Sequence, residues 1–153
     1  MSEDSFEERV IKECTDKQNI FIYVSKEDEI NTFSVIRKLL SIGKTIVVPV
    51  VKGNEIELSV LRDLDNLTKG EYGILEPTEK IRFQKEDIDI FFVPGTKFDN
   101  VGNRKGRGKG YFDRFLKDVK GKKPIIGICH KNQVVDKLNT NPWDVSVDRL
   151  IEK

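Results

Sequence analysis

The feature that most constrains the fold is a set of four short apolar runs, which are separated by more polar segments. Each run has the length and composition of a strand that is buried on both faces of a sheet. In the segments between them, apolar side chains recur every three or four residues, which is the period of an amphipathic helix. Strands that alternate with helices predict a layered α/β/α fold with a mostly parallel central sheet. The four runs are Ile20–Val24, Lys44–Val51, Ile88–Val93 and Pro124–Cys129.

Helices are predicted from apolar periodicity and from residues that favour helix ends. A short surface helix is expected over Ser5–Lys17, and another helix over Tyr111–Val119. After the first strand, Ser25 and Asp28 resemble a capping box. A helix is therefore expected to begin there and to end at Gly43.

The remaining segments predict smaller elements. Glu55–Leu61 alternates polar and apolar residues, so it is expected to form a hairpin with the strand before it. Arg62–Lys85 is polar and broken by glycine and proline, which predicts a loop-rich flap, and Trp143–Ile151 suits a last short strand. Pro49 lacks an N–H group and is expected at the end of its strand, whereas Gly127 indicates close packing against the backbone.

The charge balance and the cysteines narrow the class of protein. The chain has 27 basic and 26 acidic side chains, whereas a dedicated nucleic-acid binder is usually basic overall. No apolar run is long enough to span a membrane, and the first residues do not resemble a signal peptide. Cys14 and Cys129 are far apart, as expected for free thiols in a reducing compartment. We therefore expect a cytoplasmic protein, a monomer or homodimer, whose residues 1–153 form a single domain without nucleic-acid or membrane partners.

Residues Gly102–Asp113 form a loop of alternating glycines and cations, which reads GNRKGRGKGYFD. Because glycine lacks Cβ, such a backbone can turn several N–H groups towards one anion. The spacing matches neither the P-loop nor the dinucleotide-binding fingerprint. Composition alone leaves three interpretations open, namely a site for nucleotide phosphates, a site for RNA phosphates and a solvated turn. The loop follows an apolar strand, and ligands of open α/β sheets collect at the carboxyl ends of strands.

The stretch Phe91–Leu116 closely resembles the signature of the 5-formyltetrahydrofolate cyclo-ligase family, also called methenyltetrahydrofolate synthetases. It departs at Lys105, where the family usually has Leu, and at Phe112, where the family usually has Tyr. The resemblance extends from about Asn19 to the end of the chain. The matching positions are Pro94, Gly95, Phe98, Asp99, Gly102, Arg104, Gly106, Gly108, Gly110, Tyr111 and Asp113.

The resemblance implies an ATP- and Mg²⁺-dependent enzyme that converts 5-formyltetrahydrofolate to 5,10-methenyltetrahydrofolate and releases ADP and phosphate. It implies that Arg104, Arg107 and Lys109 act on the transferred phosphoryl group. The alternative is a nucleotide- or folate-binding homologue that lacks this turnover, because a fold alone does not fix a function. The residues implied to bind ATP are Arg104, Lys105, Gly106, Arg107, Gly108, Lys109, Gly110, Tyr111 and Phe112.

The family pattern also implies a metal site and a folate site. Asp113 and Asp144 match the carboxylates that bind Mg²⁺, an ion that prefers few carboxylates together with phosphate oxygens and water. The residues implied to contact the folate are Val24, Glu29, Tyr72 and Tyr111.

Two further features concern the N-terminal helix, which differs from the family pattern, and His130, which could be mistaken for a catalytic base. Typical members begin with a basic helix, and this chain is expected to be a short member that lacks it, since neither Arg9 nor Lys12 matches the pattern. His130 is the only histidine, yet the family uses no histidine there, so we expect a strand-end residue. Gln133 matches a fixed glutamine of the same segment.

Overall fold

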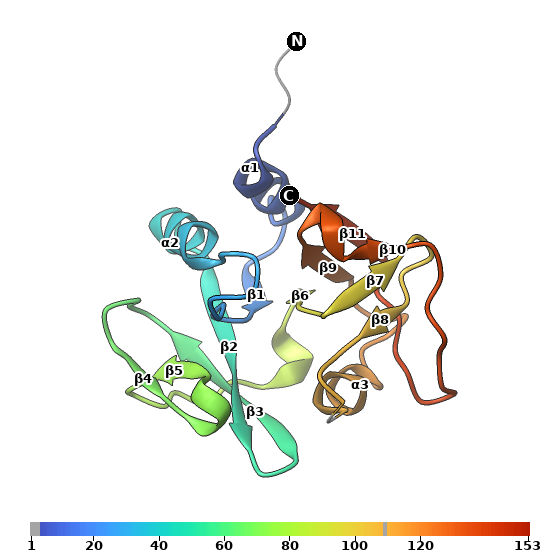
Figure 1. Cartoon of the computed structure of the whole chain (residues 1–153). Helices are drawn as coiled ribbons and strands as arrows, with labels where there is room; N and C mark the ends of the chain where they lie inside the picture. Colours follow the sequence, from blue (N-terminus) through green and yellow to red (C-terminus); the bar gives the residue numbers. More distant parts are fainter. Residues whose placement is uncertain (1–3, 109) are drawn as a thin grey trace.

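The computed structural model describes residues 4–108 and 110–153. Its centre is a six-stranded sheet with the order β11-β9-β6-β1-β2-β3 (Figure 1). Every neighbouring pair is parallel except β2 and β3, which form an antiparallel hairpin. The mostly parallel sheet predicted from the apolar runs is therefore confirmed. The strands are β1 (Asn19–Ile22), β2 (Thr45–Lys52), β3 (Glu55–Leu61), β6 (Ile90–Val93), β9 (Ile125–Cys129) and β11 (Arg149–Glu152).

Helices cover both faces of the sheet, which confirms the three layers. Helices α1 (Phe6–Glu13) and α2 (Phe33–Ser41) pack on one face, and α3 (Tyr111–Leu116) packs on the other. The alternation of side chains along β1 explains the two cores, since Ile20 and Ile22 belong to the first and Phe21 to the second. None of the helices in the described part of the chain is long and apolar enough to cross a membrane.

The segment expected to be a loop-rich flap contains only short elements. It holds an antiparallel pair of strands, β4 (Leu67–Lys69) and β5 (Leu75–Pro77), and two 3-10 turns, η1 (Glu71–Gly73) and η2 (Lys85–Asp87).

A small second sheet was not expected from the sequence. Its three strands, in the order β10-β7-β8, lie beside the end of β6. The strands are β7 (Lys97–Asp99), β8 (Arg104–Lys105) and β10 (Val134–Val135), and the 3-10 turn η3 (Lys131–Gln133) precedes the last of them.

The predicted start of α2 is wrong. The helix begins at Phe33, and Ser25 does not cap it. Instead, the Ser25 hydroxyl accepts a hydrogen bond from the Thr32 N–H, and the Thr32 hydroxyl accepts one from the Ser25 N–H. Because these reciprocal bonds close a loop of their own, residues 26–31 stay outside the helix and remain at the end of β1.

Two strand predictions also need correction. Pro49 lies inside β2, opposite Leu58 of β3, and not at the end of the strand. Lys52 and Glu55 form the hydrogen-bonded pair that closes a two-residue hairpin, and every second pair along the two strands exchanges hydrogen bonds. Pro49 and Leu58 form one of the pairs in between, so the missing proline N–H leaves no backbone bond unmade. The last strand is β11, and it begins at Arg149 rather than at Trp143.

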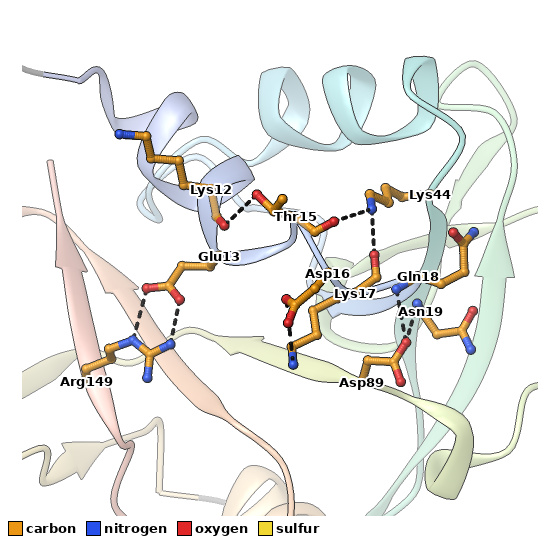
Figure 2. Close-up of polar contacts among 10 residues, drawn as sticks. All are labelled: Lys12, Glu13, Thr15, Asp16, Lys17, Gln18, Asn19, Lys44, Asp89 and Arg149. Atoms are coloured by element: carbon orange, nitrogen blue, oxygen red, sulfur yellow. Dashed lines mark hydrogen bonds and ion pairs between the residues drawn. The ribbon is translucent and has the colours of Figure 1, made fainter.

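Polar contacts fasten α1 and the start of β1 to the rest of the fold (Figure 2). Arg149 of β11 donates two hydrogen bonds to the Glu13 carboxylate at the end of α1. The Asp89 carboxylate, just before β6, accepts hydrogen bonds from the N–H groups of Gln18 and Asn19. Burial alone would raise the pKa of Asp89, but these hydrogen bonds, together with the positive charges of Lys123 and Lys17, outweigh it and lower the pKa. The N-terminal helix and the first strand are thus held on the same sheet as the last strand.

Candidate active site

A cavity of about 580 Å³ opens at the carboxyl edge of the parallel strands. Val24 lines it just beyond β1, Pro94 and Gly95 line it just beyond β6, and Val51 lines it near the end of β2. Open α/β sheets bind their ligands at this edge. The position of the cavity therefore agrees with the place in the fold where a ligand is expected.

The residues that the sequence singled out converge on this cavity. Lys109 lies outside the described residues, so the structure does not place it. All the other predicted site residues line the cavity: Val24, Glu29, Tyr72, Arg104, Lys105, Gly106, Arg107, Gly108, Gly110, Tyr111, Phe112, Asp113 and Asp144. Residues that are far apart in the sequence are thus brought to one site.

The glycine-rich loop is held by the second sheet and turns at its glycines. The Thr96 N–H and hydroxyl both donate to the Lys105 carbonyl oxygen, over 2.7 and 3.0 Å. Gly108 and Gly110 have φ values of +89° and +71°, which other residues rarely adopt. Helix α3 has only six residues, so its dipole adds little to the charge of the loop.

Arg104 is buried in the wall of the cavity, with 8% of its surface exposed. Its Nε donates a hydrogen bond to the Pro94 carbonyl oxygen, and its guanidinium carbon lies 5.0 Å from the centre of the Phe112 ring. Burial lowers the pKa of Arg104, while the negative charges of Asp113 and Asp144 oppose this shift. The side chain thus carries a fixed positive charge next to both carboxylates.

Arg107 lies at an exposed position of the loop and bridges to another segment. Its Nη2 donates to the Asp28 carboxylate over 2.9 Å, and both side chains are more than half exposed. This hydrogen bond raises the pKa of Arg107 and lowers the pKa of Asp28. The loop after β1 and the glycine-rich loop are thereby joined by an ion pair. Because this pair is exposed to solvent, it is weak and can open.

The two carboxylates predicted to bind Mg²⁺ come from α3 and from the β10–β11 connection. The Asp113 Oδ1 accepts a hydrogen bond from the Val145 N–H over 3.0 Å, which ties these two segments together. The Asp144 Oδ2 accepts one from the Asn141 N–H over 2.8 Å. In the part of the chain that the structure describes, no group of three or more His, Cys, Asp or Glu could hold a metal ion. Two carboxylates beside a loop suited to phosphates fit Mg²⁺, which is usually bound by one or two carboxylates with phosphate oxygens and water.

The residues predicted to contact a folate form a wall of mixed character. Val24 is buried, Glu29 is half-buried, and the Glu29 Oε1 accepts a hydrogen bond from the Lys26 N–H over 2.8 Å. Burial raises the pKa of Glu29, and this hydrogen bond opposes the shift. The wall therefore offers an apolar surface together with one carboxylate.

Tyr72 is held over the cavity by the flap. Among the described residues, Tyr72 is the only non-glycine residue with a positive φ, at 58°. The Tyr111 hydroxyl lies 3.2 Å from the Tyr72 hydroxyl and 3.0 Å from the Gly53 carbonyl oxygen. The Lys26 ammonium donates to the Tyr72 carbonyl oxygen over 3.0 Å. These contacts keep a strained tyrosine in place at the mouth of the site.

Several residues of the cavity wall were missed in the sequence. Lys26, Asn141 and Trp143 line the cavity, but none of them was assigned a role. A signal existed for Trp143 and Asn141, because both lie within three residues of Asp144. Lys26 lies only two residues after Val24. Adjacency to a predicted site residue is therefore the clue that could have found them.

His130 and Gln133 lie outside the cavity wall. The His130 N–H donates to the Gln133 side-chain oxygen over 2.8 Å, and the Gln133 amide donates to the Gly95 carbonyl oxygen over 2.8 Å. Gln133 thereby supports the backbone at the end of β6. Arg9 also points elsewhere, since it donates to the Glu152 carbonyl oxygen at the end of β11.

Comparisons with known proteins agree with the fold and with the signature. A model of the 5-formyltetrahydrofolate cyclo-ligase family matches residues 2–153. A 5-formyltetrahydrofolate cyclo-ligase of Haemophilus influenzae is 34% identical over 134 residues, which cover 84% of this chain and 72% of that protein. A probable 5-formyltetrahydrofolate cyclo-ligase of Caenorhabditis elegans is 30% identical over 150 residues, which cover 89% of this chain and 73% of that protein.

Solved structures give the same result. The structure of a 5,10-methenyltetrahydrofolate synthetase from Aquifex aeolicus has a TM-score of 0.78 and 33% identity, and the match covers 96% of this chain and 77% of that one. A 5,10-methenyltetrahydrofolate synthetase from Mycoplasma pneumoniae has a TM-score of 0.75 and 26% identity, with 95% and 81% covered. The family resemblance predicted from the signature is thus confirmed, and the chain belongs to the 5-formyltetrahydrofolate cyclo-ligase family of enzymes.

Proposed function

We propose that this enzyme converts 5-formyltetrahydrofolate and ATP to 5,10-methenyltetrahydrofolate, ADP and phosphate, with Mg²⁺ as cofactor. The observation that carries the proposal is the convergence of three sets of residues on one cavity. These sets are the glycine-rich cationic loop, the pair Asp113 and Asp144, and the wall with Val24, Glu29 and Tyr72. A triphosphate and a pterin can meet only if their sites share one space, and this cavity provides that space.

The chemistry explains why both substrates must meet. The formyl group on N5 is a poor electrophile, and its oxygen is a poor leaving group. Attack of the formyl oxygen on the γ-phosphorus of ATP breaks the bond to ADP and gives an N5-iminium phosphate. N10 then attacks the formyl carbon and loses its proton to solvent, the carbon–oxygen bond breaks, and phosphate leaves as the ring closes. Such a transfer asks the protein mainly for positioning and for neutralisation of charge.

The cations and the backbone of the loop suit the triphosphate. Arg104 provides a buried positive charge at the cavity wall, and Lys105 lines the same wall. Arg107 can exchange the Asp28 carboxylate for a phosphate, because its ion pair is exposed to solvent. We assign Lys109 to the triphosphate from the sequence pattern.

Asp113 and Asp144 would hold Mg²⁺ beside these groups. When bound there, the ion would neutralise charge on the phosphate oxygens. Hydrogen bonds from Val145 and Asn141 fix the orientation of the two carboxylates, so the protein presents them in place before a substrate arrives.

The other wall suits the pterin. Tyr72 and Tyr111 can pack against the flat heterocycle, and Val24 provides an apolar contact. The Glu29 carboxylate can accept hydrogen bonds from the N–H groups of the pterin when it is ionised. The two tyrosine hydroxyls keep the flap and α3 together at this wall.

A steady-state assay tests the proposal. The full chain is mixed with 5-formyltetrahydrofolate, ATP and Mg²⁺, and formation of the methenyl product is followed by its absorbance while ADP is measured in parallel. We expect the two products in equal amounts and a loss of turnover when Mg²⁺ is chelated. Binding of both substrates without methenyl product would contradict the proposal and favour a binding homologue.

Substitution of Lys109 tests the role of the loop cations. We expect Lys109→Ala to lower kcat/KM for ATP at least about tenfold, because it removes a positive charge from the triphosphate site. Lys117→Ala removes an exposed lysine just after α3, outside the cavity, and is the matched control. Unchanged turnover of the Lys109 variant would remove this lysine from the site.

A further inference from the structure

We infer that Trp143 is the surface on which the nucleobase of the nucleoside triphosphate stacks, and this inference rests on the proposed function. Trp143 is the only tryptophan of the chain, and it lines the cavity. Its side chain is nevertheless exposed, with 68% of the residue surface accessible. A large flat ring at the wall of a cavity offers a stacking surface to a flat ligand.

The backbone that carries Trp143 is fixed to the proposed phosphate site. The Asp144 N–H donates to the Asn141 carbonyl oxygen over 3.0 Å, which closes a turn around Trp143. The Val145 N–H donates to Asp113 of α3. Trp143 is also the immediate neighbour of Asp144, a proposed Mg²⁺ ligand. The indole is therefore positioned next to the triphosphate site, where the remainder of a nucleotide must lie.

The flap that carries Tyr72 lies elsewhere. Figure 1 shows β4 and β5 on one side of α3 and the connection between β10 and β11 on the other side. Because Tyr72 belongs to the β4–β5 flap and Trp143 to the β10–β11 connection, the two aromatic residues serve different parts of the cavity. The two substrates contain two flat ring systems, the pterin and the nucleobase. If the pterin lies against the flap, the nucleobase is the ring that can stack on Trp143.

Of the other aromatic residues of the cavity wall, Tyr23 is buried, with 4% of its surface exposed, and the remaining three have ring partners. Tyr72 and Tyr111 pack against each other with centroids 6.3 Å apart. Phe112 packs edge-on against Phe21 and Phe115. Among the residues that the structure describes, no ring contact of Trp143 is found. A nucleobase would supply the missing stacking partner, and stacking of a base on an aromatic side chain is favourable for every base.

Fluorescence gives the first test, since all indole emission comes from Trp143. The full chain is titrated with MgATP, with Mg²⁺ and inorganic triphosphate, and with 5-formyltetrahydrofolate, using excitation at the red edge of the indole band, where adenine does not absorb. We expect MgATP to quench the emission and inorganic triphosphate to leave it unchanged. Equal quenching by inorganic triphosphate, or quenching by the folate alone, would overturn the inference.

Calorimetry on variants gives the second test. We expect Trp143→Ala to raise the Kd of MgATP about tenfold and to leave the Kd of inorganic triphosphate unchanged. Trp143→Phe retains a ring and should stay close to the wild type. Val101→Ala removes an exposed apolar side chain outside the cavity and is the matched control. An unchanged Kd for MgATP in Trp143→Ala, or an equal loss for both ligands, would overturn the stacking.

The turnover assay separates this inference from the proposed function. If the wild type forms methenyl product and Trp143→Ala binds MgATP as tightly as the wild type, only the stacking is overturned. If the wild type binds MgATP in a Trp143-dependent manner but forms no product, the stacking stands and the proposed function fails.

Discussion

Arg104 joins the glycine-rich loop to the end of the central sheet. It donates to the Pro94 carbonyl oxygen just beyond β6 and lies over the Phe112 ring at the start of α3. A Cβ atom at Gly106 would lie 3.1 Å from one of its terminal nitrogens, so a side chain at that position would press on the guanidinium. A glycine of the loop thus makes room for a buried cation.

Asp99 stabilises the turn that leads into this loop. The residue is 1% exposed, and its carboxylate accepts hydrogen bonds from the N–H groups of Val101, Asn103 and Leu138 and from the Asn103 side chain. Burial alone would raise the pKa of Asp99, but these hydrogen bonds outweigh it and lower the pKa. We expect Asp99→Asn to lower the free energy of unfolding by about 2–4 kcal/mol, because an amide turns a donor towards these N–H groups.

The sign of the pH dependence follows from the lowered pKa. The ionised carboxylate stabilises the folded state at every pH above its ordinary value of 3.8, and this contribution is lost as the pH falls through the lower pKa of the folded state. Urea unfolding of the wild type and of Asp99→Asn over a series of pH values measures the difference. A gap between the two that does not narrow in acid would contradict this account.

Glu29 should make folate binding depend on pH. Because burial raises its pKa above the ordinary value of 4.5, the carboxylate loses its charge sooner than an exposed glutamate as the medium becomes acidic. The ionised carboxylate is an acceptor at both oxygens, whereas the protonated form turns an O–H donor towards its partners. We expect the KM for 5-formyltetrahydrofolate to rise as the pH falls through this pKa.

The variant Glu29→Gln provides the control for this pH dependence. At neutral pH, its KM for the folate should be about tenfold higher, since a charged hydrogen bond is lost. Over the pH range in which Glu29 titrates, the KM of this variant should stay constant, whereas the KM of the wild type changes. A bend of the same size in both proteins would assign the titration to another group.

At the residue scale, most of the predicted positions belong to one contiguous signature, and the family resemblance added Val24, Glu29, Tyr72 and Asp144. Arg104 to Asp113 are close together in the sequence, so a local pattern contains them. The partner of Arg107 was not predicted, since Asp28 is 79 residues away and only the tertiary fold brings the two together. Lys26 and Trp143 lie close in the sequence to predicted site residues, which is a clue to their place, but local spacing does not show that their side chains line the cavity.

At the scale of elements, the buried parallel strands could be predicted because each is a continuous apolar run. The start of α2 could not, since Ser25 and Thr32 form reciprocal hydrogen bonds that compete with helix capping. The small sheet of β7, β8 and β10 also escaped prediction. Strands of two or three residues are too short to show a period of two.

Gly102 docks this small sheet on the β10–β11 connection. Its φ is +89°, and a Cβ atom there would lie 2.3 Å from the Val147 carbonyl oxygen. The Gly102 carbonyl oxygen also accepts a hydrogen bond from the Val147 N–H over 2.8 Å. We expect Gly102→Ala to lower the free energy of unfolding by about 3 kcal/mol or more, because backbone strain and steric overlap add.

Gly121→Ala is the matched control for Gly102→Ala. Gly121 has a φ of +83°, but a Cβ atom there would meet nothing within 4 Å. This variant should lose only about 1 kcal/mol from backbone strain. Urea unfolding of both variants measures the two free energies of unfolding. Equal losses in both variants would contradict the predicted steric overlap with Val147.

At the scale of the whole molecule, the first helix and the last strand lie together. Arg9 of α1 donates to the Glu152 carbonyl oxygen of β11, and Glu13 pairs with Arg149. Figure 1 shows the C-terminus beside α1. Because α1 packs on the sheet whose edge strand is β11, we propose that residues 1–153 form one domain that unfolds as a unit.

The two cysteines test this cooperativity, because each reports on a different core. Cys14 belongs to the core between the sheet and α1 and α2, whereas Cys129 belongs to the core beneath α3. Burial raises the pKa of Cys14 to about 12 and that of Cys129 to about 11, so neither thiol reacts readily in the folded state near neutral pH. Pulse alkylation along a urea series, with each cysteine-containing peptide followed by mass spectrometry, should give the same midpoint for both residues and for the far-UV circular dichroism. Labelling of one cysteine at clearly lower urea would mean that its layer opens alone, since a single cooperative transition exposes both cores at once.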